Sequence, residues 1–213
     1  GGIYFGKKGR NNKNMSAYDT CNYSKDEIVR LAKIGFDLAS KRSKKLCCVD
    51  KANVMETSRL WRETIQSMEK DYPKIEVSYE FVDAVAMRLI QWPKNYDVLI
   101  TENLFGDILT DEASVISGSM GLMPSASIGE KTSLYEPIHG SYPEATGKNI
   151  ANPLATILSA AMMFENSFNL KEEAQLIKDS VVDSLDKKIV TSDISKDKSY
   201  TTSYVGDWIT SKI

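Results

Sequence analysis

Two aspartates spaced four residues apart, Asp107 and Asp111, are the residues of this sequence that most suggest chemistry. They stand at the start of an apolar segment, Ile108 to Ile116, which predicts a helix, and residues at this spacing share one face of a helix. Neighbouring carboxylates repel each other unless positive charge lies between them, and a divalent cation with oxygen ligands can provide it. The alternative is a solvated acidic helix start, where aspartate also suits the helix dipole. The pair alone leaves both interpretations open.

Three predicted strands lead directly into polar residues. The strands are Leu46 to Val49, Ile75 to Val82 and Tyr96 to Thr101. Lys51 and Asn53 follow the first, Asp83 follows the second, and Asp107 follows the third, with Gly106 at the junction. Helical patterns separate the strands, over about 24–43, 54–70 and 84–91, and this alternation indicates α/β architecture.

In such sheets the carboxyl ends of the strands form the ligand crevice. Asp83, Asp107 and Asp111 then give three carboxylates from two strand ends, which is the oxygen set that a hard divalent cation needs. A solvated lysine at position 51 and a helix cap at Asp83 are the plain alternatives. Tyr4, at the end of a predicted strand Ile3 to Phe5, could donate a proton or be an ordinary half-buried tyrosine.

The character of the sequence changes near Gly118. Residues 119–142 are rich in Gly, Ser and Pro and show no helical period, whereas Asn152-Pro153 is a strong helix start. Helices are predicted to about Phe168, to about Asp186 and over 204–213. The glycine-bearing segment before Asn152 is a plausible nucleotide cradle, although alone it is typical of a loop. No GxGxxG follows a strand, so a Rossmann site is not supported.

Composition excludes several classes of protein. The net charge is −2 with no basic block, which gives no case for a nucleic-acid partner, and no apolar run approaches a membrane span. The basic residues of the polar loop predicted over 6–14 do not change this. Three cysteines, two of them adjacent in an apolar run, favour free thiols in a reducing compartment, and we expect a cytoplasmic protein. Because the chain begins Gly1-Gly2 without Met, we expect a C-terminal fragment.

Seven segments, in order, resemble the metal-dependent β-decarboxylating dehydrogenases, the family of isocitrate and isopropylmalate dehydrogenases. The resemblance covers nearly all of the chain and is closer to the isopropylmalate branch. The segments are GGIYFG, VDKANV, FVDAVAMRLI, TENLFGDILTDEAS, GSMGLMPSASIG, YEPIHGSYPE and GKNIANPLATILSAAMM.

The resemblance implies an isocitrate/isopropylmalate dehydrogenase-like two-domain α/β fold, non-Rossmann, with its N-terminal part missing. Residues 1–117 would be the dimerisation and metal/substrate domain, and residues 118–213 the C-terminal portion of the cofactor-binding domain. It also implies a homodimer with shared active sites, in which Lys51 and Asp83 of one subunit meet Tyr4, Asp107 and Asp111 of the other.

The implied activity is NAD-dependent oxidative decarboxylation of 3-isopropylmalate in leucine biosynthesis, with Mg²⁺ or Mn²⁺. Alternatives are another 2-hydroxy-diacid dehydrogenase, acting on isocitrate, homoisocitrate or tartrate, and a non-catalytic subunit of the family. By the resemblance, Tyr4 protonates the enolate and Lys51, with Asn53 beside it, takes the hydroxyl proton. Asp83, Asp107 and Asp111 match the metal-holding carboxylates.

The resemblance also places the cofactor. The residues expected to bind it are Glu136, His139, Gly140, Glu144 and Asn152. Glu144 departs from the aspartate usual in the family, but it keeps an acceptor for the ribose hydroxyls and repels a 2′-phosphate, so NAD stays favoured over NADP. The arginines and specificity residues for the substrate are expected before Gly1, and the 213 residues alone are expected to be inactive.

Overall fold

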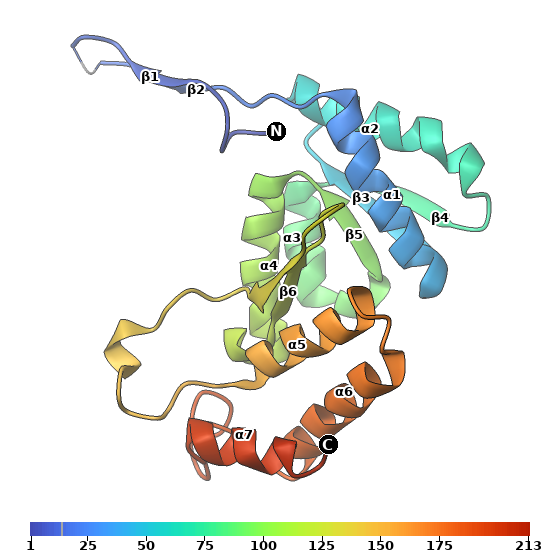
Figure 1. Cartoon of the computed structure of the whole chain (residues 1–213). Coiled ribbons are helices and arrows are strands. Elements are labelled where there is room, and N and C mark those ends of the chain that lie inside the picture. Colours follow the sequence, from blue (N-terminus) through green and yellow to red (C-terminus); the bar gives the residue numbers. More distant parts are fainter. Residues whose placement is uncertain (14) are drawn as a thin grey trace. The chain divides into compact units, whose positions relative to one another are not determined.

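The computed structural model describes residues 1–13 and 15–213 and divides into two compact units (Figure 1). The first unit is Gly1–Ala113 and the second is Ser114–Ile213. The division falls inside helix α4 (Asn103–Ser117), four residues before the boundary predicted between residues 117 and 118. The roles that the resemblance gives to the two parts stay predictions.

A three-stranded parallel sheet forms the centre of the first unit. Its strands, in spatial order, are β4 (Glu76–Phe81), β3 (Lys45–Asp50) and β5 (Val98–Thr101). The register aligns Asp50 with Phe81 and Val49 with Thr101, so all three strands end at one edge of the sheet. The three predicted strands are confirmed, and this common edge is where their polar residues follow.

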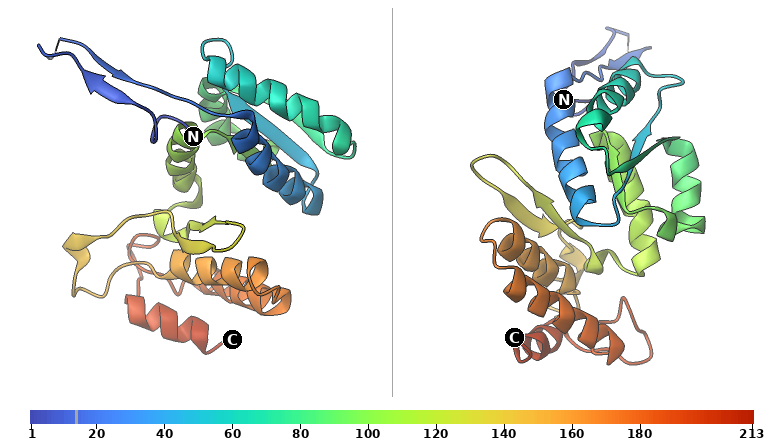
Figure 2. Two further views of the ribbon diagram at one scale, coloured as in Figure 1. Left: turned by 45° about the horizontal axis from the view of Figure 1, so that its top comes forward. Right: turned by 90° about the vertical axis from the view of Figure 1, so that its right-hand side faces the viewer.

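Helices cover both faces of this sheet (Figure 2). They are α1 (Lys25–Lys41), α2 (Glu56–Met68), α3 (Val82–Gln91) and α4. Leu46 and Cys48 of β3 share a core with α1 and α2, whereas Cys47 and Val49 share a second core with α3 and α4. The alternation follows from the two-residue period of a strand, and the apolar run of β3 reflects burial on both faces.

Helices α3 and α4 begin earlier than the sequence pattern predicts. Helix α4 starts at Asn103 and not near Ile108, so Gly106 lies within the helix and not at a junction. Phe81 is the N-cap residue of α3, and its side chain makes no capping hydrogen bond. Asp83 is therefore not the cap but lies in the first turn, with its carboxylate engaged elsewhere.

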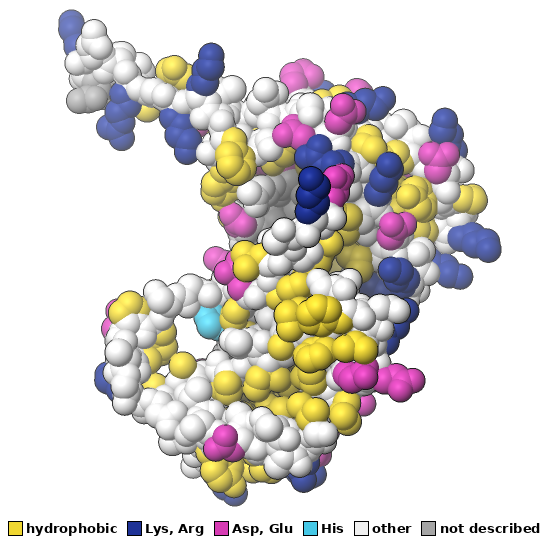
Figure 3. Space-filling view, in the orientation of Figure 1, with side chains coloured by type: hydrophobic (Ala, Val, Ile, Leu, Met, Phe, Trp, Pro, Cys, Tyr) yellow, Lys and Arg dark blue, Asp and Glu magenta, His cyan; other side chains and the backbone are white. Residues whose placement is uncertain are grey.

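A two-stranded hairpin precedes α1. Its antiparallel strands are β1 (Lys8–Arg10) and β2 (Ala17–Asp19). Lys and Arg side chains, dark blue in Figure 3, stand along it. The loop that the sequence predicts over residues 6–14 contains β1. Asn14, the last residue of that loop, lies outside the described residues.

Residues 3–6 form a turn, so the strand predicted for Ile3–Phe5 is wrong. Gly2 has a φ of 84°, a left-handed conformation that favours glycine. A Cβ at this position would lie 2.4 Å from the hydroxyl of Tyr23, so the backbone also passes too close for a side chain. The turn, and not a strand, therefore places Tyr4, which is 43% exposed.

Helix α5 (Leu154–Asn166) is the centre of the second unit. It packs against the hairpin of β6 (Pro124–Ser127) and β7 (Leu134–Pro137), and against α6 (Lys171–Asp186), which also contacts α7 (Thr202–Thr210). Buried Leu154, Val181 and Val205, one from each of these three helices, share a core. The three helices were predicted, but the β6–β7 hairpin lies in a segment for which no element was expected.

The three cysteines are free thiols, as their number and placement predict. Within residues 1–13 and 15–213, no helix combines the length and apolar character that crossing a membrane requires.

Candidate active site

The carboxyl edge of the sheet in the first unit is fixed by a buried ion pair. Asp50, the last residue of β3, is 1% exposed and accepts hydrogen bonds from Arg62 Nε at 2.8 Å and Nη2 at 3.0 Å. Its Oδ1 also accepts from the backbone N–H of Ala52 at 2.9 Å. The hydrogen bond to Asp50 raises the pKa of the Arg62 guanidinium. Through these contacts the Asp50 carboxylate holds the chain on both sides of Lys51.

Lys51 and Asp83 form an ion pair at this edge. Nζ of Lys51 lies 2.5 Å from Oδ1 of Asp83 and 5.8 Å from the centre of the Phe81 ring. The hydrogen bond from Lys51 lowers the pKa of the Asp83 carboxyl. The Lys51 side chain is 25% exposed and that of Asp83 is 67% exposed, so an incoming ligand can reach both.

Tyr4 and Asp107 form a second pair. The Tyr4 hydroxyl donates a hydrogen bond to Oδ2 of Asp107, which lies on the exposed side of α4 one turn before Asp111. This hydrogen bond raises the pKa of Tyr4, and partial burial and the negative charges of Asp107 and Glu102 act in the same direction. Tyr4 therefore keeps its proton at neutral pH and can serve as a proton donor.

Glu102 is a buried acid beside this pair that sequence reasoning did not single out. It is 5% exposed, its Oε2 lies 3.6 Å from the Cys21 thiol that donates to it, and its Oε1 has no hydrogen-bond partner among the described residues. Burial raises the pKa of the Glu102 carboxyl. Its position directly after the apolar strand 98–101 is the signal that could have identified it.

Glu102→Gln is expected to raise the free energy of unfolding at neutral pH. Burial raises the folded-state pKa of this carboxyl, so its charged form costs stability, whereas glutamine fills the same space without charge. The cost is absent below the unfolded-state pKa and grows as the pH rises through the folded-state pKa. Urea unfolding should therefore show a gain at neutral pH that shrinks toward pH ~4. An equal gain at both pH values would contradict this origin.

Within one chain, the carboxylates predicted to bind a metal lie in separate side-chain pairs and do not form one metal-binding group. Within the described residues, no group of three or more His, Cys, Asp or Glu side chains could hold a metal ion. Asp83 lies with Lys51, and Asp107 lies with Tyr4. Asn53 lies in an exposed turn between β3 and α2. The oxygen ligands suit a hard cation in kind, but in one chain they are too few to enclose it.

The residues predicted to bind the cofactor lie in the second unit, around the long loop between β7 and α5 (Figure 1). Glu136 is exposed on β7, and Gly140 and Glu144 are exposed beyond it. Nδ1 of His139 lies 3.0 Å from the carbonyl oxygen of Gly140, whereas its buried Nε2 has no partner in the described part of the chain. Asn152 stands at the far end of the loop, where its Oδ1 accepts from the backbone N–H of Leu154 at 3.0 Å.

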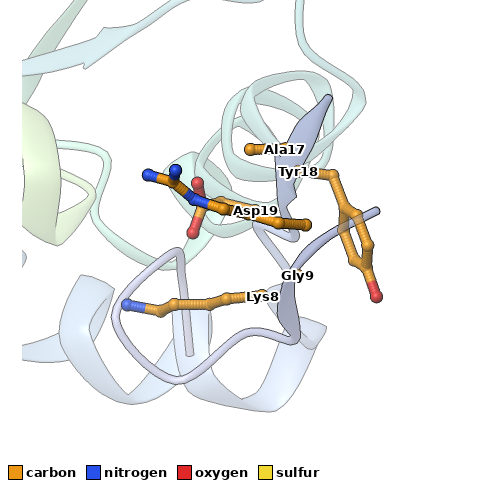
Figure 4. A pocket seen from close by; sticks show the side chains of 6 residues that line it. Lys8, Gly9, Ala17, Tyr18 and Asp19 are labelled. Atoms are coloured by element: carbon orange, nitrogen blue, oxygen red, sulfur yellow. The ribbon is translucent and has the colours of Figure 1, made fainter. Parts of the chain in front are cut away.

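A hollow of about 350 Å³ lies elsewhere, on the N-terminal hairpin (Figure 4). It is lined by Lys8, Gly9, Arg10, Ala17, Tyr18 and Asp19. The side chains of Lys8 and Tyr18 point to opposite sides of the hairpin, as the two faces of a strand require. None of the predicted site residues lines this hollow, so the candidate site rests on the sheet edge.

The family model described as isocitrate/isopropylmalate dehydrogenase matches residues 1–209. The chain belongs to the isocitrate/isopropylmalate dehydrogenase family. The resemblance of the sequence motifs to this family is thereby confirmed.

Relatives within the isocitrate/isopropylmalate dehydrogenase family include two bacterial enzymes. The 3-isopropylmalate dehydrogenase of Bacteroides fragilis is 55% identical over 211 residues, which are 98% of this chain and 59% of that protein. The 3-isopropylmalate dehydrogenase of Desulfitobacterium hafniense is 51% identical over 209 residues, which are 97% of this chain and 59% of that protein. The chain therefore spans 59% of the length of these two relatives.

Solved structures of the family match the fold. An isocitrate dehydrogenase from Methylococcus capsulatus superposes with a TM-score of 0.93 at 34% identity, covering 99% of this chain and 64% of that one. A β-decarboxylating dehydrogenase from Thermococcus kodakarensis, in its apo form, gives a TM-score of 0.86 at 31% identity, covering 98% and 60%. The expected isocitrate/isopropylmalate dehydrogenase-like α/β fold is confirmed.

Proposed function

We propose that the whole protein is an NAD-dependent 3-isopropylmalate dehydrogenase of leucine biosynthesis. It oxidises the 2-hydroxyl of 3-isopropylmalate and releases the β-carboxylate as carbon dioxide, which leaves 4-methyl-2-oxopentanoate. The observation that carries the proposal is the pairing of Lys51 with Asp83 and of Tyr4 with Asp107, in a chain 55% identical to a 3-isopropylmalate dehydrogenase.

The two pairs divide the acid–base chemistry. Lys51, in its neutral form, accepts the proton of the 2-hydroxyl at Nζ as the hydride leaves carbon 2. The bond to the β-carboxylate then breaks, its electron pair stays on the substrate, and the Tyr4 hydroxyl donates the proton that completes the product. The raised pKa of Tyr4 supports this role because the hydroxyl still carries its proton at neutral pH.

The metal ligands proposed are Asp83, Asp107 and Asp111. Mg²⁺ or Mn²⁺, when bound, supplies positive charge at the substrate hydroxyl and the adjacent carboxylate. Three carboxylates suit such a cation in kind, and their division into separate groups within one chain is consistent with a site completed by a second subunit and by substrate.

The cofactor is proposed to lie on the loop from Glu136 to Asn152. The buried Nε2 of His139, which has no partner in the described part of the chain, suits a hydrogen bond to an adenine ring. The exposed carboxylate of Glu144 suits the ribose hydroxyls and repels a 2′-phosphate. NAD, when bound, accepts the hydride from carbon 2 of the substrate.

A homodimer with shared active sites follows from the same proposal. Exposed apolar side chains support it: Met87 and Ile90 of α3 are 61% and 60% exposed, and Ile108 and Val115 of α4 are 56% and 77% exposed. Such faces are suited to burial against another protein surface. The proposal includes no nucleic-acid or membrane partner, and it places the enzyme in the cytoplasm, where free thiols such as Cys47 persist.

Turnover of the whole protein on three 2-hydroxy diacids tests the proposal. With NAD and Mn²⁺, kcat/KM is expected to be at least about tenfold higher for 3-isopropylmalate than for isocitrate or tartrate, because one well-matched apolar group changes transition-state binding by ~1–3 kcal/mol. NADH absorbance and carbon dioxide release measure the two halves of the reaction. A preference for isocitrate would overturn the substrate assignment, and absence of turnover on all three would overturn the proposed function.

A further inference from the structure

Asp193, in the irregular segment between α6 and α7, accepts hydrogen bonds from three side chains of the second unit. Its Oδ2 accepts from Ser119 Oγ and from Asn152 Nδ2, the latter at 2.9 Å, and its Oδ1 accepts from Thr191 Oγ1 at 2.5 Å. Asp193 is exposed, and partial burial of its carboxyl alone would raise the pKa, but the three hydrogen bonds outweigh this effect and hold the pKa below the ordinary value. The acceptor is therefore a carboxylate at neutral pH.

The contact with Asp193 fixes both ends of the Asn152 amide. Nδ2 donates to Asp193, and Oδ1 accepts from the backbone N–H of Leu154 at the start of α5. A rotation that exchanged nitrogen and oxygen would lose both hydrogen bonds. Because the amide nitrogen carries two hydrogens and Asp193 takes one, the other keeps a fixed direction.

Gly121 makes this arrangement possible. A Cβ there would lie 2.6 Å from Cβ of Asn152, so only glycine lets the two backbones approach this closely. The Gly121 N–H donates to Ser119 Oγ at 2.9 Å, and Ser119 donates in turn to Asp193. The segment before β6 and the start of α5 are thus joined through one carboxylate.

Residues at the start of α7 hold the same loop at Asn149 and Ala151, just before Asn152. The backbone N–H of Thr202 donates to the Asn149 carbonyl at 2.9 Å, and its Oγ1 donates to the Ala151 carbonyl at 2.5 Å. The Asn149 side chain donates to Ser203 Oγ at 2.8 Å and accepts from its N–H at 3.0 Å. Asn149 itself has a φ of 54°, a left-handed conformation that asparagine tolerates.

These hydrogen bonds hold a segment of the chain that buries little of its own surface. Residues 146–151 are all exposed, so the hydrogen bonds that hold them do not serve to complete an apolar core. A ligand site benefits from an exposed loop that is already held in one conformation, because such a loop loses less conformational entropy when the ligand binds.

From these contacts we infer that Asp193 is a positioning residue for the dinucleotide. It holds the amide of Asn152 and the loop of residues 149–152 in the form that binds the adenosine half of the cofactor. Thr202 supports the same loop from α7. The inference rests on the proposed function, because it takes the Asn152 loop as the cofactor site.

Asp193→Asn in the whole protein tests this role. One amide oxygen cannot replace two carboxylate oxygens for three donors, so at least one hydrogen bond to a charged group is lost. The dissociation constant for NAD, from calorimetric titration, and the KM for NAD are both expected to rise about tenfold. The kcat at saturating NAD and the KM for the hydroxy acid should stay within about twofold, because the sheet-edge residues are untouched.

Two further variants complete the experiment. Asp197→Asn removes the same charge from an exposed position of the same segment and should leave NAD binding unchanged. Thr202→Val keeps the branched shape, loses the hydroxyl bonded to Ala151, and should weaken NAD binding in the same direction. If Asp193→Asn does not fold, Thr191→Val, which removes one donor to Asp193, decides by the same NAD measurements.

The outcomes separate the two proposals. If the wild-type protein binds NAD and a folded Asp193→Asn variant binds it equally well, the positioning role of Asp193 is overturned, and unchanged affinity in Thr202→Val would overturn the supporting role of Thr202. A lower melting temperature with unchanged NAD affinity would overturn it too, since a merely structural role predicts that result. Wild-type protein that neither binds NAD nor turns over 3-isopropylmalate would overturn the proposed function, and the positioning role with it.

Discussion

Lys51→Met in the whole protein should lower kcat by about 10²- to 10⁴-fold, the usual contribution of a positioned general base. Methionine keeps most of the length and the apolar character of the side chain but removes the amine that pairs with Asp83 and lies over the Phe81 ring. The fold should survive, because Asp83 is 67% exposed and an exposed ion pair contributes little stability. Single-turnover formation of NADH measures the expected loss of hydride transfer.

Lys51→Arg separates proton transfer from charge. Arginine can keep the ion pair with Asp83, yet it cannot be deprotonated in a protein and so cannot accept the hydroxyl proton. We expect Lys51→Arg to be about as inactive as Lys51→Met. If Lys51→Arg retains most of the activity, Lys51 acts by its charge and not as a base.

Tyr4→Phe is the matched contrast, because it removes the other proton-carrying group and leaves the Lys51–Asp83 pair intact. NADH should still form in the first turnover, while carbon dioxide release and the protonated product should lag behind it. If the variants of Lys51 and Tyr4 stall at the same step, the proposed division of roles is wrong.

The elements that were predicted correctly are those with a strong signal in a short stretch of sequence. The capping box of Ser24 and Glu27 starts α1 where expected, and the continuous apolar run of β3 indicated a strand. The strand predicted at Ile3–Phe5 failed because three residues carry almost no period, and the left-handed backbone at Gly2 turns the chain instead. The β6–β7 hairpin was missed because its strands have only four residues each, with proline at the first position of β6 and at the last position of β7, and so give a weak strand signal.

The candidate site could be predicted only in part for a similar reason. Residues directly after predicted strands, such as Lys51 and Asp83, could be placed at one sheet edge from the α/β pattern alone. The contact of Tyr4 with Asp107, 103 residues apart, has no local signal. Asp193 likewise lies in a polar stretch that is typical of a loop, and Ser119, one of its partners, is 74 residues away. Such contacts follow from tertiary structure and not from local sequence.

Asp107→Asn should raise the Mn²⁺ concentration needed for half-maximal activity by roughly tenfold or more in the whole protein. Asparagine has nearly the same shape and can still accept the Tyr4 hydrogen bond through its amide oxygen, but it brings no charge to a cation. The hydrogen bond to Asp107 is the largest cause of the raised pKa of Tyr4, so that pKa should also fall toward its ordinary value. Tyr4 then still carries its proton at neutral pH, and kcat should largely recover at saturating Mn²⁺.

Direct Mn²⁺ binding, measured by calorimetric titration with substrate present, separates weaker metal binding from a damaged chemical step. Glu112→Gln is the matched control, because it removes one charge from α4 at a residue outside the proposed ligand set. The control should leave the Mn²⁺ titration within about twofold, since a solvent-accessible charge that does not bind the cation is largely screened. A Mn²⁺ requirement of Asp107→Asn equal to that of Glu112→Gln would mean that the Asp107 carboxylate serves Tyr4 alone and does not contact the metal.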